Sequence, residues 1–141
     1  MRSCAVVLGM TLGMVCLPAL ADGAGETGGK AAAPAPGFAD QVARARKDIA
    51  GKKGAAYDVE LNKQFASRHV DTVGSCVEAS GESEPVAFQV VIVVAKDGKV
   101  SSVSVNPETE VAQCLRKALL QETFPKPPFA PFYDLLEMSF E

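Results

Sequence analysis

The sequence predicts an α+β domain with the element order helix, helix, strand, strand, helix, strand. Three observations support this prediction. Apolar residues recur at helical spacing in three segments. A nearly continuous β-branched run separates the second segment from the third, and Asp97-Gly98 follows that run where a hairpin turn would reverse the chain. The 141 residues contain no internal repeat and suffice for one small domain.

Residues 1–21 predict a cleavable export signal. Arg2 gives the start a positive charge, an apolar run of about 13 residues follows, and Ala19 and Ala21 are small residues at the positions that a signal peptidase reads. A membrane-spanning helix needs roughly 20 residues, which leaves a retained anchor as the less favoured alternative. Cleavage after about Ala21 would place the mature chain in the periplasm without a membrane span.

The composition of the mature chain argues against several functions. The 14 basic residues less Arg2 leave 13 against 17 acidic ones, a net charge of about −4. An acidic balance does not fit a sequence-independent nucleic-acid binder, which depends on clustered cations. His69 is the single histidine, and neither a four-ligand metal site nor an oriented nucleophile is evident around it. We therefore expect a protein that is not an enzyme and that has no metal, cofactor or nucleic-acid partner.

Residues 22–37 are rich in glycine, alanine and proline, and predict a flexible leader because they have too little apolar surface to offset the entropy of ordering. The next segment, 38–54, predicts an amphipathic helix that Gly51 and Gly54 bring to an end. Its apolar residues at helical spacing are Phe38, Val42, Ala45 and Ile49. The sequence leaves open whether this helix docks on the domain that follows, residues 57–141.

A second helix is expected from about Asp58, a favourable N-cap, to Ala79. The apolar residues of its expected buried stripe are Leu61, Phe65, Val70, Val73 and Val77. Cys76 lies beside this stripe, so its side chain is expected to face the element on which the helix packs. Glu82 and Glu84 follow in an acidic loop before the first strand.

A hairpin of two strands comes next. Residues 86–96 contain a run of β-branched side chains that is typical of a central strand covered on both faces. Asp97 and Gly98 predict a two-residue turn because both tolerate a positive φ. The return strand is expected at about 99–105, with a β-bulge near Ser101 where the alternation of valine and serine breaks.

The pair Asn106-Pro107 predicts the start of a third helix, since a cap is followed by proline in the first turn. The apolar stripe of this helix consists of Val111, Cys114, Leu115, Ala118 and Leu119. Prolines in segment 124–128 end it. The last strand is expected at 133–140, with Leu136, Met138 and Phe140 on one face.

Cys76 and Cys114 are expected to form a structural disulfide. Cys4 and Cys16 leave with the export signal, which gives the mature chain an even pair in an oxidising compartment. Two alternatives stay open, a pair of buried thiols and a reactive redox pair. A crosslink that closes about 38 residues would stabilise the domain by roughly 4 kcal/mol in the chain-entropy model.

Several short motifs occur in an order that resembles a known family. They are Ser75-Cys76-Val77-Glu78, Asp97-Gly98-Lys99-Val100, Val103-Ser104-Val105, Gln113-Cys114-Leu115, Phe124-Pro125-Lys126-Pro127 and the final Phe140. In this order they resemble the carboxy-terminal domain of TonB-like proteins, and more closely the AgmX/PglI carboxy-terminal domain. The resemblance covers roughly residues 61–141.

The resemblance implies a short antiparallel three-stranded sheet with helices packed on one face, and it implies that Cys76 and Cys114 face each other. It also implies a non-enzymatic protein of the cell envelope that contacts other proteins. A TonB-like energy transducer needs a retained anchor and a long proline-rich spacer, whereas the spacer here is about sixteen residues, shorter than a semi-rigid linker across the periplasm would need to be. We therefore expect protein binding without energy transduction.

Two surfaces are candidate partner sites. The first is the edge of the last strand, where an extended partner segment or a second copy of the chain would pair with the main chain. The residues expected there are Phe129, Phe132, Tyr133 and Leu135, although the aromatic rings would alternatively seal the core. The second surface is the acidic loop with Glu82 and Glu84, which would suit a periplasmic immunity or inhibitor protein that blocks a secreted toxic enzyme.

Overall fold

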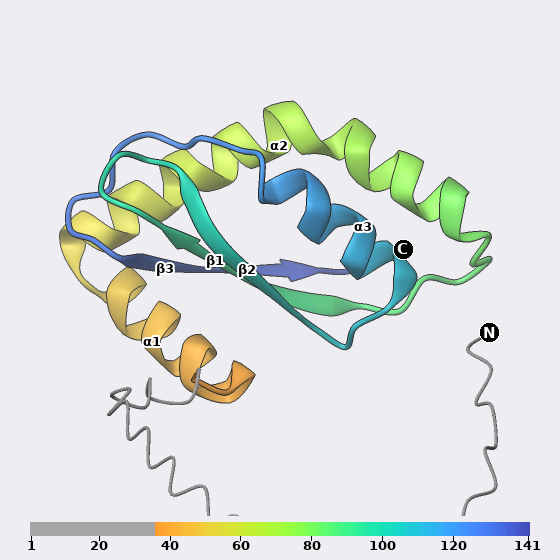
Figure 1. Cartoon of the computed structure of the whole chain (residues 1–141), viewed down its shortest axis with the longest axis horizontal. Helices are drawn as coiled ribbons and strands as arrows, with labels where there is room; N and C mark the ends of the chain where they lie inside the picture. Colours follow the sequence, from red (N-terminus) through yellow and green to blue (C-terminus); the bar gives the residue numbers. More distant parts are fainter. Residues whose placement is uncertain (1–35) are drawn as a thin grey trace, which may run out of the picture. The chain divides into compact units, whose positions relative to one another are not determined.

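The computed structural model describes residues 36–141 (Figure 1). The predicted export signal and nearly all of the predicted leader lie outside these residues. The elements are α1 (Phe38–Ala50), α2 (Lys52–Ser80), β1 (Phe88–Val94), β2 (Val100–Asn106), α3 (Glu110–Leu119) and β3 (Phe132–Met138). The predicted α+β class and element order are confirmed. None of the helices in the described part of the chain is both long and apolar enough to cross a membrane.

The three strands form one antiparallel sheet in the order β2-β1-β3. The central strand β1 pairs with β2 on one side, where Ile92 lies opposite Val103, and with β3 on the other, where Ile92 lies opposite Asp134. All five residues from Val90 to Val94 are buried. A β-branched run with no polar residue fits this position because both faces of the strand are covered.

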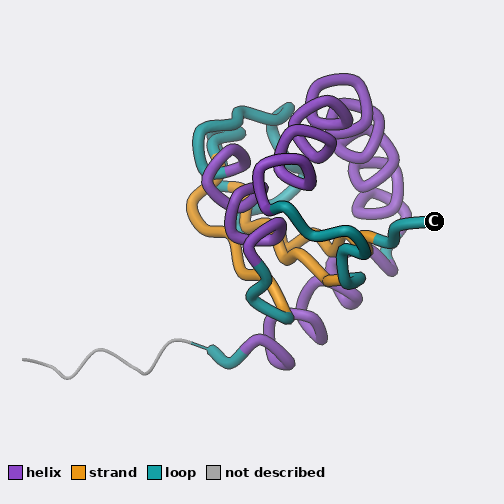
Figure 2. Tube along the Cα trace, turned by 90° about the vertical axis from the view of Figure 1, so that its right-hand side faces the viewer, coloured by secondary structure: helices purple, strands orange, loops and turns teal. Residues whose placement is uncertain are grey.

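Helices cover both faces of the sheet. Figures 1 and 2 show α2 and α3 together on one side of the strands and α1 on the other. Burial agrees with this arrangement, because Val90 and Ile92 belong to the main core, whereas Val91 and Val93 point to the opposite face and are buried as well. The expectation of helices on one face therefore holds for α2 and α3, and α1 docks on the other face.

The main core lies between the sheet and the pair α2 and α3. It is built from the inward residues of β1 and β2, the apolar stripe of α3, and aromatic side chains from both ends of the chain. These residues are Tyr57, Leu61, Phe65, Cys76, Phe88, Val90, Ile92, Val94, Val103, Val105, Val111, Ala112, Leu115, Leu119, Phe124, Phe132 and Leu136. The edge of this core is completed by half-buried Val73, Val77 and Phe140.

The boundary between the first two helices differs from the prediction. Only Gly51 separates α1 from α2, so the second helix begins at Lys52 and not at Asp58. Gly54 lies inside α2, where a Cβ atom would overlap the carbonyl oxygen of Asp48. Glycine is needed here because the last turn of α1 packs directly on the first turn of α2, a contact between segments that local propensity does not reveal.

Replacing Gly54 by alanine is expected to destabilise the domain, although alanine is the better helix former. The clash with the Asp48 backbone must be relieved by separating α1 from α2, at a cost of about 1–3 kcal/mol. Gly74→Ala is the matched control, since it adds a Cβ in open space in the same helix and is expected to stabilise by about 0.8–1 kcal/mol. Urea denaturation measures both changes, and equal effects would contradict the close contact.

The β1–β2 connection has three residues between the paired Ala95 and Lys99, one more than predicted. Gly98 has a φ of 89° and donates its N–H to the carbonyl of Ala95 at 2.9 Å, the arrangement of a turn followed by a glycine bulge. A Cβ atom at Gly98 would overlap the carbonyl oxygen of Phe124. The β-bulge near Ser101 is confirmed, because the register shifts between Val93 and Val94.

Two further expectations are corrected. Asn106 is the last residue of β2 and pairs with Gln89, so α3 begins later, with the Thr109 hydroxyl accepting from the Ala112 N–H at 3.2 Å. Val70 was expected on the buried stripe of the second helix, but its side chain is 61% exposed. Five residues after Phe65, it lies about 140° around the helix from that buried ring.

Candidate functional site

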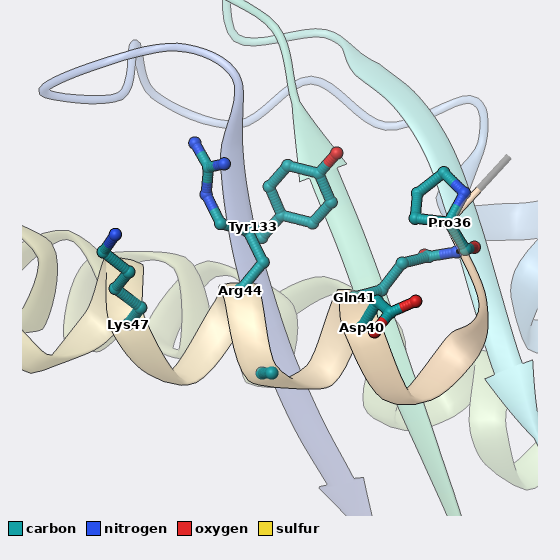
Figure 3. Close-up of a pocket in the computed structure, with 7 residues that line it drawn as sticks. Pro36, Asp40, Gln41, Arg44, Lys47 and Tyr133 are labelled. Carbon is teal, nitrogen blue, oxygen red and sulfur yellow. Dashed lines mark hydrogen bonds between the residues drawn. The ribbon is translucent and has the colours of Figure 1, made fainter. Parts of the chain in front are cut away.

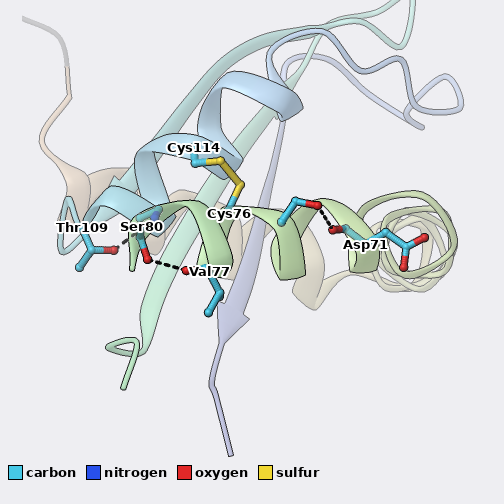
Figure 4. Close-up of a disulfide and its surroundings, with 8 residues drawn as sticks. Asp71, Cys76, Val77, Ser80, Thr109 and Cys114 are labelled. Carbon is cyan, nitrogen blue, oxygen red and sulfur yellow. Dashed lines mark hydrogen bonds between the residues drawn. A yellow bond between two sulfur atoms is a disulfide. The ribbon is translucent and has the colours of Figure 1, made fainter. Parts of the chain in front are cut away.

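The predicted disulfide is present (Figure 4). It joins Cys76 near the end of α2 to Cys114 in the middle of α3, with Cα atoms 5.7 Å apart. Cys76 is buried in the main core. The sulfur atoms are therefore in a structural crosslink that fixes one helix to the other, and neither is available as a thiolate nucleophile.

The single histidine is part of a polar cluster that ties α2 to the segment after α3. His69 Nε2 lies 2.8 Å from Glu122 Oε2, and Arg68 Nη1 donates to Glu122 Oε1 at 2.8 Å. Burial by itself would raise the pKa of Glu122, but the Thr123 N–H, His69 and Arg68 together hold it below its usual value. This cluster therefore positions the connecting segment, and His69 Nδ1 is a buried ring nitrogen without a hydrogen-bond partner among the described residues.

Metal binding finds no support among residues 36–141, where no three histidine, cysteine or acidic side chains converge as a cation would require. The cysteines are crosslinked and the histidine is engaged with Glu122. The described residues also present surfaces and strand edges that a partner could contact.

The expected aromatic partner surface is mostly taken up by the core. Phe132 is fully buried and meets Tyr57 edge to face at 4.8 Å between ring centroids, so its inclusion as a partner contact is wrong. Phe129 packs on Phe132 and stays 42% exposed. Tyr133 and Leu135 are half-buried on the opposite face of β3. The ring of Phe132 faces inward because it shares a face with Asp134 and Leu136, which the core covers.

The edge of β3 is partly occupied by α1. The buried carboxylate of Asp48 accepts a hydrogen bond from the Tyr133 N–H at 3.1 Å. Arg44 donates to the other oxygen of Asp48 at 3.2 Å and lies 5.4 Å from the centroid of the Tyr133 ring. Figure 3 shows Arg44 and Tyr133 side by side, where α1 crosses β3. The first outward N–H on this edge is therefore already paired within the chain.

The outward direction of the Tyr133 N–H shows which other backbone groups on this edge are open. In an antiparallel ladder, successive residues of a strand point their backbone groups to alternate sides. Tyr133 bonds to Asp48 and not to β1, so Leu135 and Glu137 also point away from β1. Two residues on β3 thus present N–H and C=O groups at its outer edge.

The same alternation identifies the outward groups of β2. Val93 is paired with Tyr133 on one side and with Ser102 on the other. Because Tyr133 points away from Val93, the backbone groups of Val93 are directed to Ser102. The next residues therefore alternate, and Val103 and Val105 direct their N–H and C=O groups to the outer side of β2.

The outer edge of β2 is uncharged. At its start the Val100 N–H donates to the carbonyl of Glu122 at 3.3 Å, which closes that end. The rest, from Ser101 to Asn106, contains no charged residue and no proline, and Ser102 is exposed. Edge strands that must not pair usually carry lysine, proline or an inward charge. β2 has none of these features, whereas β3 has the inward-facing acidic residue Asp134 and the cover of α1.

Replacing Asp48 by alanine is expected to loosen α1 from β3. The change removes a charge-assisted hydrogen bond to a partly buried N–H, which lowers the free energy of unfolding by about 2 kcal/mol. Hydrogen exchange at the Tyr133 amide should accelerate. Asp40→Ala, an exposed acidic residue of the same helix with no bond to β3, is the control. Unchanged exchange at Tyr133 would contradict the role given to Asp48.

The acidic loop lies at the opposite end of α2 from α1. Glu82 is half-buried, with its N–H donating to the Ser80 hydroxyl at 3.2 Å, and Glu84 is exposed. Beside Glu84 is an open hollow of about 620 Å³ that Val86 and Phe140 help to line. Charged and apolar groups therefore meet at this end of the molecule, as the alternative inhibitor function would require.

One buried residue was not predicted from the sequence. Asp134 is fully buried on β3, and neither of its carboxylate oxygens has a hydrogen-bond partner among the described residues. Burial, together with the nearby charge of Asp58, raises the pKa of Asp134 to about 8. The signal was its position, since Asp134 alternates with Phe132 and Leu136 and therefore shares their inward face.

No family model, curated protein or solved structure matches this chain. The resemblance to TonB-like and AgmX/PglI domains accordingly remains a prediction from the order of short motifs. Function is inferred below from the geometry of residues 36–141.

Proposed function

We propose that this chain is a non-enzymatic, periplasmic protein-binding module that accepts an extended partner segment as a fourth strand of its sheet. The observation that carries the proposal is the uncovered, uncharged outer edge of β2, with backbone groups of Val103 and Val105 directed outward. The resemblance to TonB-like domains, which pair with extended segments of other envelope proteins, supports the same mode of binding.

β2 is a better pairing edge than β3. On β3 the Tyr133 N–H is already bonded to Asp48, and α1 lies against the strand. On β2 only Val100, at the start, is paired outside the sheet. A partner strand on β2 would gain main-chain hydrogen bonds at two successive outward residues, and the hydroxyls of Ser102 and Ser104 would lie beside its side chains.

A rigid sheet makes such binding less costly in entropy. The hairpin is held at its turn by Phe124, whose N–H donates to the Gly98 carbonyl at 2.9 Å. The disulfide holds α2 and α3 together above the same strands. Because the edge is ordered before a partner arrives, only the partner segment has to lose conformational freedom on binding.

Site-specific photocrosslinking in living cells tests this proposal. A photoreactive amino acid at Ser102 should capture an envelope protein, whereas the same residue at Arg46, exposed on α1, should not. Backbone hydrogen exchange with a peptide from the captured protein then identifies the edge. We expect the Val103 and Val105 amides to become at least about tenfold more protected on binding, as closed hydrogen bonds require.

The outcomes separate the two edges. Protection of Leu135 and Glu137 in place of Val103 and Val105 would transfer the site to β3. If the bound peptide protects neither edge, strand addition is wrong. Capture at Arg46 equal to capture at Ser102 would show contact without selectivity.

The alternative function is that of an immunity or inhibitor protein, and the charge at one end of α2 favours it. Glu84 and Glu141 line the hollow beside Val86. Such an acidic surface would steer the protein to a basic active-site cleft. Glu84→Lys with Glu141→Lys should then abolish protection of cells against a secreted hydrolase encoded next to this gene, and should leave strand addition at β2 unchanged.

A further inference from the structure

The side of α2 that faces away from the core carries an unexpected apolar stripe. Val59 is 67% exposed and Val70 is 61% exposed, and they are the two most exposed large hydrophobic side chains of the described residues. The residues that follow one another at alternating spacings of four and three are the exposed Lys52, Ala56, Val59, Lys63, Ala66 and Val70, and the stripe then continues into Val73 and Val77, which are half-buried at the edge of the core. An average spacing of 3.5 residues is the seam of a coiled coil, which packs one helix against another.

The charges at the two ends of α2 are the reverse of what an isolated helix prefers. Lys52 and Lys53 lie in the first turn and Glu78 in the last, where the helix dipole favours acidic and basic groups respectively. No salt bridge to any described residue offsets this arrangement. The helix therefore carries unpaired charge of the wrong sign at each end.

A second α2 that runs in the opposite direction would satisfy both features. We propose that α2 is a self-association surface, on which a second copy of this chain docks its own α2 antiparallel to the first. With Val59 of one copy opposite Val70 of the other, Ala56 lies opposite Val73 and Lys63 opposite Ala66. This register is symmetric about a two-fold axis, as a closed dimer requires.

Charge complementarity selects the second copy as the occupant. In an antiparallel pair the same side of each seam meets, and Lys53 and Glu78 lie on the same side because each directly follows a seam residue, Lys52 and Val77, with Glu78 farther from the seam than Lys53. Lys53 of each copy therefore approaches Glu78 of the other. Two such pairs form by symmetry, and each end of the helix gains a charge of the sign that its dipole attracts.

The expected dimer is reversible. The seam from Lys52 to Val77 is about 38 Å long, and a single helix pair of this length covers less area than a standard interface. Its small side chains, Ala56 and Ala66, permit a close approach, while the charged Lys63 at its centre limits affinity. This surface is separate from the outer edge of β2, so the proposal does not depend on strand addition.

Sedimentation velocity of the purified, disulfide-bonded chain over a wide range of concentration tests the inference. We expect a monomer–dimer equilibrium that Val59→Asp with Val70→Asp shifts fully to monomer. Val86→Asp, at an exposed valine outside the seam, is the control and should leave the equilibrium unchanged. A chain that stays monomeric at millimolar concentration, or a dimer that the double variant does not weaken, overturns the proposal.

An exchange of the charges at Lys53 and Glu78 tests the antiparallel register. Lys53→Glu alone and Glu78→Lys alone should each weaken dimerisation by about tenfold, since each places like charges together at both ends. The two substitutions combined should restore it. Both changes favour the helix dipole within one chain, so loss of the dimer cannot come from unfolding. Failure of the combined variant to recover would exclude this register.

Discussion

Removal of the Cys76–Cys114 disulfide is expected to destabilise the domain by roughly 4 kcal/mol, because the crosslink closes a loop of 38 residues and restricts the unfolded chain. For a domain of this size, the melting temperature should fall by roughly 15–25 °C. The loss of stability should be greatest at the contact between α2 and α3, because the crosslink joins these two helices above the sheet. Thermal unfolding of the purified chain with and without a thiol reductant measures the effect.

Two comparisons make this result specific. The variant Cys76→Ser with Cys114→Ser should melt at the temperature of the reduced native chain, and reductant should not change it further. Coincident melting of the native chain with and without reductant would show that the crosslink contributes little. A variant that melts far below the reduced chain would indicate that the cysteine side chains matter for packing, since Cys76 is part of the core.

Asp134→Asn is expected to stabilise the protein at neutral pH and to flatten the pH dependence of its stability. The pKa of Asp134 is raised from 3.8 to about 8 in the folded state, so between these values the folded chain holds a proton that the unfolded chain has lost. The free energy of unfolding therefore falls as pH rises, by about 1.4 kcal/mol for each pH unit. Asparagine has the shape of the protonated carboxyl group and does not ionise. At pH 7 the gain should be roughly 4 kcal/mol, which is this slope multiplied over the three pH units above 3.8.

The measurement is urea denaturation at several pH values from 4 to 9. Glu137→Gln serves as the control, because Glu137 is an exposed carboxylate on the same strand. Asp58→Asn should give part of the effect, since the charge of Asp58 contributes to the raised pKa of Asp134. Equal slopes for native protein and Asp134→Asn would contradict a protonated, buried Asp134.

The elements that the sequence predicts well have strong local signals. The run from Val90 to Val94 predicts a strand that is covered on both faces. The irregular valine spacing beside Ser101 predicts the β-bulge. The pairing of Cys76 with Cys114 follows from an even count of cysteines after removal of the predicted export signal and from the resemblance. Each of these features depends on residues close in sequence or on simple counting.

The features that were missed depend on contacts between distant segments. Gly54 is a poor helix former, yet it lies inside α2 because the end of α1 needs the space. Asp48 bonds to Tyr133, 85 residues away, and thereby changes which sheet edge is open. Phe132 was assigned to the surface because its role depends on Tyr57, which had not been placed in the core. Local patterns contain no information about these neighbours.

The single-residue connection between α1 and α2 at Gly51 has a consequence for proteolysis. A protease that cuts the chain there releases α1, the cover over Val91 and Val93, while the crosslinked remainder keeps its shape. The remainder would then expose Val91 and Val93 on one face of the sheet, and this exposed apolar patch would promote aggregation. One cut at Gly51 would thus convert a chain whose sheet face is covered into a fragment that aggregates.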